Sequence, residues 1–269
     1  MLDCLLLGTV GVAGESVSQG RDTLALIDTT TTSRFETSVP EDLCGRYPEN
    51  DPARMFDPER LDPALSTHLV LPGDRLWDAA ERFVYSMFRV SGFCAESPRE
   101  WVEESQPWRE RSKLHVITEA DGQVIGVCRT IVGTYDELPV SQFRPTVPVP
   151  DGPLCEIGSL AVRPTQRGLG VANELHRIAF QMGIREGVQG FAFLIDQWMF
   201  EFFESHYGLP VRALAPAREF MGGEVVPTAM WMPEMMHQLV RTRPNVYKWS
   251  VEGFEPQVYV DLDLPILLD

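Results

Sequence analysis

The residues best suited to chemistry lie in one stretch, where a carboxylate, Glu156, precedes two glycines, Gly168 and Gly170. Apolar residues after Glu156 predict a strand that ends at Pro164, and the apolar spacing after Ala172 predicts a helix. Glycines let backbone N–H groups approach a ligand, and a helix start adds unpaired N–H groups and the positive end of its dipole. The stretch therefore predicts a phosphate-binding turn with a carboxylate on the strand before it.

Two common phosphate-binding signatures do not fit this stretch. The chain has no G-x-x-x-x-G-K-[ST] pattern, and the segment from Gly168 to Ala172 lacks the G-x-G-x-x-G order of dinucleotide sites. The remaining pattern is Arg-x-x-Gly-x-Ala, carried by Arg167, Gly170 and Ala172. It resembles the acyl-CoA loop of the GCN5-related N-acetyltransferase (GNAT) superfamily. An ordinary strand-to-helix turn with the same glycines is the alternative interpretation.

The order of the predicted elements also resembles that superfamily, over about residues 75 to 235. Two alternating runs, 114–119 and 124–131, flank Asp121 and Gly122, which predicts a β-hairpin. Residues 190–195 have the pattern of a buried strand, and an aromatic helix follows. The resemblance implies an α/β (α+β) fold with a mixed, mostly antiparallel central sheet flanked by helices, and with an irregular N-terminal extension.

A finer resemblance is to the branch that holds autoinducer synthases and N-acyl amino acid synthases. It rests on the segment 84–89, the strand around Arg129, Glu156 and the segment 208–227. Members of that branch usually take an acyl chain from acyl carrier protein. Autoinducer synthases have an arginine three residues after the glutamate, where this chain has Ser159. This departure argues against homoserine-lactone synthesis and leaves acyl transfer to an amine.

The resemblance implies roles for individual side chains. Glu156 would be the general base that takes a proton from the attacking amine, and Arg129 and Phe203 would contact the substrate. Tyr207 would protonate the departing thiolate, because Phe203 occupies the position where the superfamily often has a tyrosine. Each residue also has a structural alternative: Glu156 and Arg129 could form an ion pair, and Tyr207 could pack at a helix end.

The donor is expected to lie along the Glu156 strand, with its phosphates on the glycine turn. The predicted donor-binding residues are Leu160, Ala161, Val162, Arg167, Gly168, Leu169, Gly170, Val171 and Ala172. A backbone N–H group from the first three of these would polarise the acyl carbonyl, so that the amine attacks directly and no covalent enzyme intermediate forms. The methionine-rich and aromatic segment 198–203 could line an acyl tunnel or fill an ordinary core.

Composition narrows the choice of partners. The chain has 23 Lys and Arg residues against 39 Asp and Glu residues, a formal net charge of −16, which argues against binding to nucleic acid. Docking of an acidic carrier protein would need a local basic patch. The candidates for that patch are Arg163, Arg167, Arg177 and Arg185. Five scattered cysteines without C-x-x-C spacing predict neither a metal site nor a disulfide framework.

The sequence divides into three predicted regions. Residues 1–65 form an irregular N-terminal extension, residues 66–240 a GNAT-like acyltransferase domain, and residues 241–269 an acidic C-terminal extension packed on the same domain. The first residues lack the basic start and apolar run of a signal peptide, and no segment approaches the roughly 18 apolar residues of a membrane span. We therefore expect a cytoplasmic protein.

Taken together, these features predict an enzyme, a GNAT-type N-acyltransferase of the EC 2.3.1 class. It would move an acyl group from acyl carrier protein or acyl-CoA to an amine of a small molecule or peptide. Acyl-CoA or acyl-phosphopantetheine is the expected co-substrate, without a metal. Three alternatives stay open: an acetyl-CoA-dependent small-molecule N-acetyltransferase, a thioester decarboxylase on the same fold, and a noncatalytic thioester-binding protein.

Overall fold

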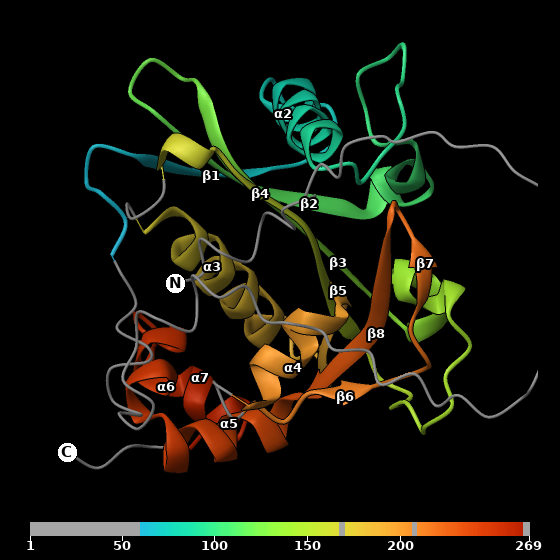
Figure 1. The fold of residues 1–269 in the computed structure, drawn as a ribbon. Helices are drawn as coiled ribbons and strands as arrows, with labels where there is room; N and C mark the ends of the chain where they lie inside the picture. Colours follow the sequence, from blue (N-terminus) through green and yellow to red (C-terminus); the bar gives the residue numbers. More distant parts are fainter. Residues whose placement is uncertain (1–59, 167–169, 206–208, 266–269) are drawn as a thin grey trace, which may run out of the picture.

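The computed structural model describes residues 60–166, 170–205 and 209–265. Their strands form one central sheet in the order β1-β2-β3-β4-β5-β8-β6, and β7 also pairs with β8 (Figure 1). The strands are β1 (Ser66–Val70), β2 (Ser112–Thr118), β3 (Val124–Gly133), β4 (Leu154–Val162), β5 (Gly190–Asp196), β6 (Arg212–Ala213), β7 (Arg218–Phe220) and β8 (Gly223–Trp231). All neighbouring pairs are antiparallel except β4 with β5.

Helices cover both faces of this sheet (Figure 1). The α-helices are α2 (Trp77–Val90), α3 (Val171–Arg185), α4 (Gln197–Ser205), α5 (Met232–Thr242), α6 (Pro244–Ser250) and α7 (Pro256–Asp261). The 3₁₀ helices are η2 (Glu103–Arg111), η3 (Tyr135–Glu137), η4 (Pro139–Gln142) and η5 (Pro164–Gln166). This arrangement confirms the predicted fold class, a mixed and mostly antiparallel sheet flanked by helices.

The two faces of the sheet have separate cores. Val127 and Cys128 are consecutive on β3 and therefore point to opposite faces. Cys128 packs in the core under α3, α5 and α6, to which Leu175 and Met235 also belong. Val127 packs in the core under α2, with Trp77. We call these the α3 face and the α2 face.

The sheet opens at its centre, between β4 and β5. The two strands pair only from Leu154 to Glu156 on β4, opposite Gly190 to Ala192 on β5. Beyond this point β5 stays paired with β8 as far as Asp196, whereas β4 follows β3. A β-bulge accompanies the change, because the register between β3 and β4 shifts and Ser159 takes a left-handed backbone conformation with φ 48°. The bulge and the lost pairing separate the ends of the two strands.

Several predicted elements are present as expected. The hairpin of β2 and β3 turns at Gly122, whose φ is 84°, and the helix predicted after the glycine turn is α3. Residues 60–65 lead into β1 without helix or strand, and the rest of the predicted N-terminal extension lies outside the described residues. The three-region division stays a prediction. No helix within the described ranges is both long enough and apolar enough to cross a membrane.

Candidate functional site

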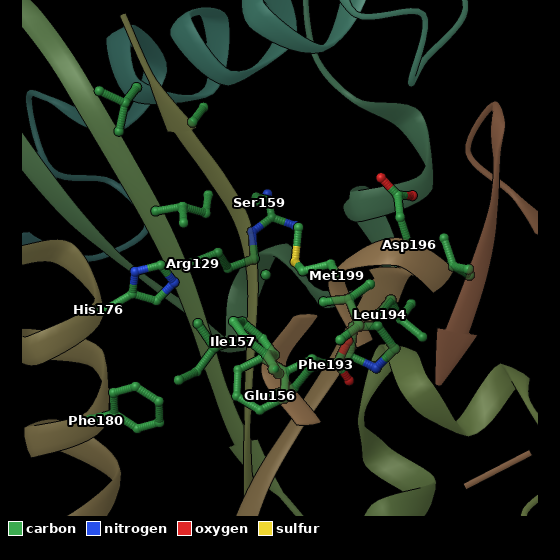
Figure 2. Close-up of a pocket in the computed structure, with 18 of the residues that line it drawn as sticks. Arg129, Glu156, Ile157, Ser159, His176, Phe180, Phe193, Leu194, Asp196 and Met199 are labelled. Atoms are coloured by element: carbon green, nitrogen blue, oxygen red, sulfur yellow. The ribbon is translucent and has the colours of Figure 1, made fainter. Parts of the chain in front are cut away.

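A cavity of about 330 Å³ occupies the opening between β4 and β5 (Figure 2). One wall is β4 from Glu156 to Val162, and another is β5 from Phe193 to Asp196. The cavity reaches both faces of the sheet, because residues of α2 and η2 line it on one face and residues of α3, α5 and α6 line it on the other. It therefore connects the two faces where strand pairing has been lost.

Glu156 lies at the point where the two strands separate. Its side chain is 5% exposed, and one carboxylate oxygen, Oε2, accepts a hydrogen bond of 2.7 Å from the backbone N–H of Val140 on η4. Burial raises the pKa of Glu156 to about 8, although the Val140 hydrogen bond and the charge of Arg129 both act to lower it. A carboxylate with this pKa gains and loses a proton near neutral pH, as a general base must.

The alternation of side chains along β4 decides to which face of the sheet Glu156 points. Its neighbours Cys155 and Ile157 belong to the core on the α3 face, so Glu156 points to the α2 face. Cys155 is fully buried, and burial raises the pKa of its thiol well above the usual value. Cys155 is thus a packing residue, and the Glu156 carboxylate is the titratable group that this strand presents to the cavity.

Arg129 on β3 lines the same cavity and is 7% exposed. Its terminal nitrogen Nη1 donates to the backbone oxygen of Ser105 at 3.5 Å, and its Nε has no hydrogen-bond partner among the described residues. Burial lowers the pKa of Arg129 to about 10, while the charges of Glu81 and Glu156 raise it. No carboxylate in the described part of the chain lies within 4.0 Å of this guanidinium, so the ion pair with Glu156 that was one interpretation of the sequence is not formed.

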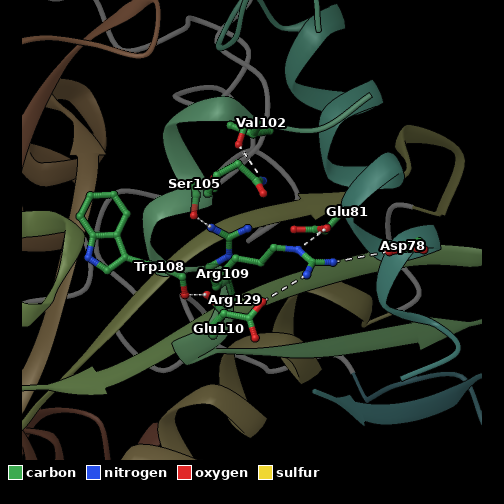
Figure 3. A network of polar contacts seen from close by, with 10 residues as sticks. Asp78, Glu81, Val102, Ser105, Trp108, Arg109, Glu110 and Arg129 are labelled. Carbon is green, nitrogen blue, oxygen red and sulfur yellow. Dashed lines mark hydrogen bonds and ion pairs between the residues drawn. The ribbon is translucent and has the colours of Figure 1, made fainter. Parts of the chain in front are cut away.

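A second arginine explains why Arg129 lacks a carboxylate partner. Arg109 on η2 takes the buried carboxylate of Glu81 at 3.2 Å and lies 3.6 Å from Asp78, both on α2 (Figure 3). Among the described residues, the Ser105 backbone oxygen is the one hydrogen-bond acceptor that holds Arg129 beside this network. A buried positive charge without a carboxylate partner in the described part of the chain thus lies at the wall of the cavity.

The predicted donor-binding residues fall into three groups. Leu160, Ala161 and Val162 line the cavity. Gly170 caps α3 with φ 71°, and Val171 and Ala172 are buried in its first turn and not among the residues that line the cavity. The other three, Arg167, Gly168 and Leu169, lie outside the described residues.

Close packing explains how the first turn of α3 reaches the sheet. A Cβ atom on Gly126 of β3 would lie 2.6 Å from the side chain of Val171, so only glycine allows the helix to approach this closely. Gly126 pairs with Val162 at the end of β4. The start of α3, with its unpaired N–H groups, therefore lies beside the end of the strand that carries Glu156.

The remaining predicted residues are the substrate-contacting Phe203, the candidate acid Tyr207 and the arginines of the basic patch. Phe203 on α4 lines the cavity, and Tyr207 lies outside the described residues. Three arginines of the proposed basic patch already have partners. Arg163 pairs with Glu119 at 3.3 Å, Arg177 binds the Glu174 carboxylate, and the Arg185 guanidinium lies 4.6 Å from the ring centre of Phe254. The fourth, Arg167, lies outside the described residues.

Asp196 and His176 are among the polar residues at the cavity that were not predicted from the sequence. Asp196 ends β5 on the same face as Glu156 and lines the cavity. Burial raises the pKa of Asp196, and a 3.3 Å hydrogen bond from Trp198 acts in the opposite direction. His176 lines the cavity from α3 (Figure 2). A polar residue that ends a buried strand is a signal that could have identified Asp196, and the i, i+4 spacing of His176 and Phe180 could have placed them on one helix face.

The part of the cavity on the α3 face is mostly apolar, with His176, Arg243 and Ser250 as its polar lining residues. It lies between α3, α4, α5 and α6 and β8. The apolar residues that line it are Phe180, Ile184, Met199, Phe203, Met230, Met235, Leu239, Val246 and Trp249. The predicted aromatic and methionine segment thus contributes Met199 and Phe203 to a cavity wall. Among the described residues, no group of three or more His, Cys, Asp or Glu side chains could hold a metal ion.

Known proteins share this architecture. Residues 77–206 match the model of the acetyltransferase (GNAT) family. FeeM, an N-acyl amino acid synthase from uncultured soil microbes, is similar in structure, with 16% identity and a TM-score of 0.51 over 66% of this chain and 96% of FeeM.

Two synthases of another kind are comparably similar. The AHL synthase LasI has 14% identity and a TM-score of 0.51 over 67% of this chain and 95% of LasI. The CoA-dependent acyl-homoserine lactone synthase BjaI has 12% identity and a TM-score of 0.50 over 75% of this chain and 91% of BjaI. At these identities the likeness concerns the fold. No curated protein sequence matches the chain significantly.

Proposed function

We propose that this chain moves an acyl group from a phosphopantetheine thioester to an amine, and the match of residues 77–206 to the acetyltransferase (GNAT) family model supports this proposal. The observation that carries the proposal is the buried Glu156 carboxylate, whose pKa is raised to about 8 at the opening between β4 and β5. A proton acceptor tuned to this range suits attack by an amine. The amine acceptor belongs to a small molecule or a peptide.

The proposed reaction is a direct transfer. The amine nitrogen forms a bond to the thioester carbonyl carbon, and the bond from that carbon to sulfur breaks. Glu156 takes the proton that the amine loses, and the sulfur leaves as a thiol after it gains a proton, for which Tyr207 is our candidate donor. Backbone N–H groups between Leu160 and Val162 would stabilise the negative charge that develops on the carbonyl oxygen.

The donor would lie with its phosphopantetheine arm along β4 and its phosphate at the start of α3. The N-terminal end of this helix favours an anion, and Gly170 permits close approach of the backbone. Either acyl-CoA or an acyl carrier protein can present such an arm. Arg163 and Arg177 already form ion pairs with Glu119 and Glu174. An acidic carrier protein would have to compete with these glutamates, so the ion pairs favour CoA as the donor.

The apolar part of the cavity favours an acyl chain longer than acetyl. Its lining extends from Phe180 and Met199 to Leu239 and Trp249. An acetyl group is too short to contact all of these apolar side chains. Burying each methylene of a longer chain contributes about 0.8 kcal/mol. We therefore propose a medium or long acyl donor, and not an acetyl donor.

The acceptor is proposed to carry a carboxylate near its amine. Arg129 lines the cavity with an unpartnered Nε, so it can bind an anionic group while the amine faces Glu156. An amino acid has both groups. The similarity in fold to FeeM, which is described as an N-acyl amino acid synthase, agrees with this assignment.

Replacement of Glu156 by Gln tests the proposed function. The amide keeps the size of the side chain but cannot accept the proton at this pH, so kcat should fall by about 100-fold or more, whereas the Kd for the acyl donor should stay within about twofold. Glu234→Gln is the matched control, because Glu234 is an exposed carboxylate that pairs with Arg212 away from the cavity. Unchanged turnover of the Glu156→Gln variant would contradict the role of Glu156.

A further inference from the structure

The imidazole of His176 is a polar group in a largely apolar wall of the cavity. His176 projects from α3 and is 9% exposed (Figure 2). Its neighbours along the helix face that lines the cavity are Phe180 and Ile184. A buried polar group in such surroundings loses free energy unless it forms a hydrogen bond. The mechanism described above does not use His176, so its ring nitrogens require an explanation.

One ring nitrogen is already assigned. The Nδ1 atom lies 3.0 Å from the backbone oxygen of Ala172, one helical turn earlier. A carbonyl oxygen can only accept a hydrogen bond, so Nδ1 must carry the proton. Burial lowers the pKa of His176 to about 4, against the raising effect of the Ala172 hydrogen bond, and the ring is neutral at physiological pH. The other nitrogen, Nε2, can then act only as an acceptor.

Aromatic packing keeps the ring in place. The imidazole stacks on Phe180, with ring centres 6.5 Å apart and planes inclined by 28°. Phe180 in turn meets the ring of Phe191 on β5 edge to face, at 4.7 Å. The ring therefore contacts Phe180, one helical turn later, and the Ala172 carbonyl, one helical turn earlier. No hydrogen bond from the described residues reaches Nε2.

The position of His176 along the cavity indicates which part of a donor it would meet. The start of α3 lies beside the end of β4, since Val171 abuts Gly126, the partner of Val162. Farther along the helix, Gly183 abuts Cys155, the residue before Glu156. His176 lies between these two levels, and so between the proposed phosphate position and the proposed base.

We propose that Nε2 of His176 accepts a hydrogen bond from an amide N–H of the donor's phosphopantetheine arm, which makes His176 a positioning residue for the thioester. This inference rests on the proposed function, because it requires a phosphopantetheine donor. The arm spans the distance between phosphate and thioester, and it carries two amide N–H groups along that distance. Its single hydroxyl group lies near the phosphate end, and the amide isosteres described below separate it from the amides. A hydroxyl group on the acyl chain has the same donor chemistry, but the chain lies beyond the thioester.

The test combines two variants with altered donors. His176→Leu removes the acceptor, and His176→Gln keeps one, because the Gln Oε1 atom can occupy a position near that of Nε2. Each protein is assayed with an acyl-pantetheine and with two isosteres, in which an ester oxygen replaces one or the other amide N–H. Binding of coenzyme A is measured by calorimetry as a readout that does not depend on turnover.

We expect His176→Leu to lower kcat/KM for the acyl-pantetheine by about 2-fold to 12-fold, the range for one net hydrogen bond, and to weaken coenzyme A binding similarly. One isostere should react equally well with wild type and with His176→Leu, which also shows that the variant is folded. His176→Gln should retain most of the wild-type value.

Two results would overturn the inference about His176. The first is an equal loss with the parent donor and with both isosteres. The second is a loss confined to donors with a hydroxyl group on the acyl chain. If wild type binds no coenzyme A and turns over no acyl-pantetheine or carrier-bound donor, the proposed function fails, and the role of His176 fails with it.

Discussion

Among single residues, Glu156 combines two opposing influences on its carboxylate. Burial at 5% exposure raises its pKa, and the N–H group of Val140 and the charge of Arg129 keep the rise to a value of about 8. A fully solvated glutamate would be ionised at neutral pH but a weak base, whereas a glutamate with this raised pKa is a stronger base, as the proposed proton transfer from an amine requires. Reactivity at this residue depends on its surroundings more than on its residue type.

The raised pKa gives a pH dependence with a definite sign. Protonated Glu156 cannot accept a proton, so kcat should fall about tenfold for each pH unit below 8 and level off above it. An amine acceptor also ionises, so acceptors whose amines have different pKa values should be compared. If the midpoint of the fall in kcat stays near pH 8 with every acceptor, the titrating group belongs to the enzyme. If the midpoint moves with the pKa of the acceptor amine, the assignment of the fall to Glu156 is contradicted.

The sequence was sufficient to predict that Glu156 lies on a strand before the glycine turn, because apolar spacing and Pro164 mark that strand. Its contact with Val140 could not be predicted, since the two residues are 16 positions apart across a proline-rich connection without a regular period. That Arg129 has no carboxylate partner among the described residues was equally hidden, because it depends on Arg109 taking the carboxylate of Glu81. Local patterns predict elements, whereas partners across the fold depend on tertiary packing.

Among the elements, the parting of β4 and β5 creates the site, and the segment of η3 and η4 closes one side of it. Tyr135 anchors this segment, since its hydroxyl lies 3.1 Å from the Val140 oxygen and 2.5 Å from the Phe143 oxygen. The same segment directs the Val140 N–H group to Glu156. The order of strands and helices could be predicted from the sequence, but the bulge at Ser159 could not, because serine rarely takes a left-handed conformation.

Tyr135→Phe should loosen this segment and weaken the hydrogen bond from Val140 to Glu156. Because that bond lowers the Glu156 pKa, its weakening should move the acid limb of the pH profile upward by up to about 1 unit. Tyr247→Phe is a matched control, since the Tyr247 hydroxyl also bonds a backbone oxygen, that of Pro265, and does not line the cavity. An equal shift in both variants, or no shift in Tyr135→Phe, would rule out the positioning role of Tyr135.

For the whole molecule, the cavity joins two chemically different regions through the sheet. The α2 face presents Glu156, Arg129 and Asp196, and the α3 face presents a mostly apolar part of the cavity that is lined in part by residues of α5 and α6. Polar groups of an acceptor and the apolar chain of a donor can thus meet at the opening between β4 and β5. Residues 232–250 of α5 and α6 lie beyond the segment 77–206 that matches the GNAT family model, so the apolar part of the cavity uses parts of the chain outside that match.

The most direct test of the central claim is a product assay with the wild-type chain. Acetyl, octanoyl and dodecanoyl donors, presented on CoA and on an acyl carrier protein, are mixed with amino acids and analysed by mass spectrometry. We predict an N-acyl amino acid and an equal amount of free thiol, with the longer chains preferred over acetyl. Release of thiol without an acylated amine, or transfer of acetyl alone, would contradict this account.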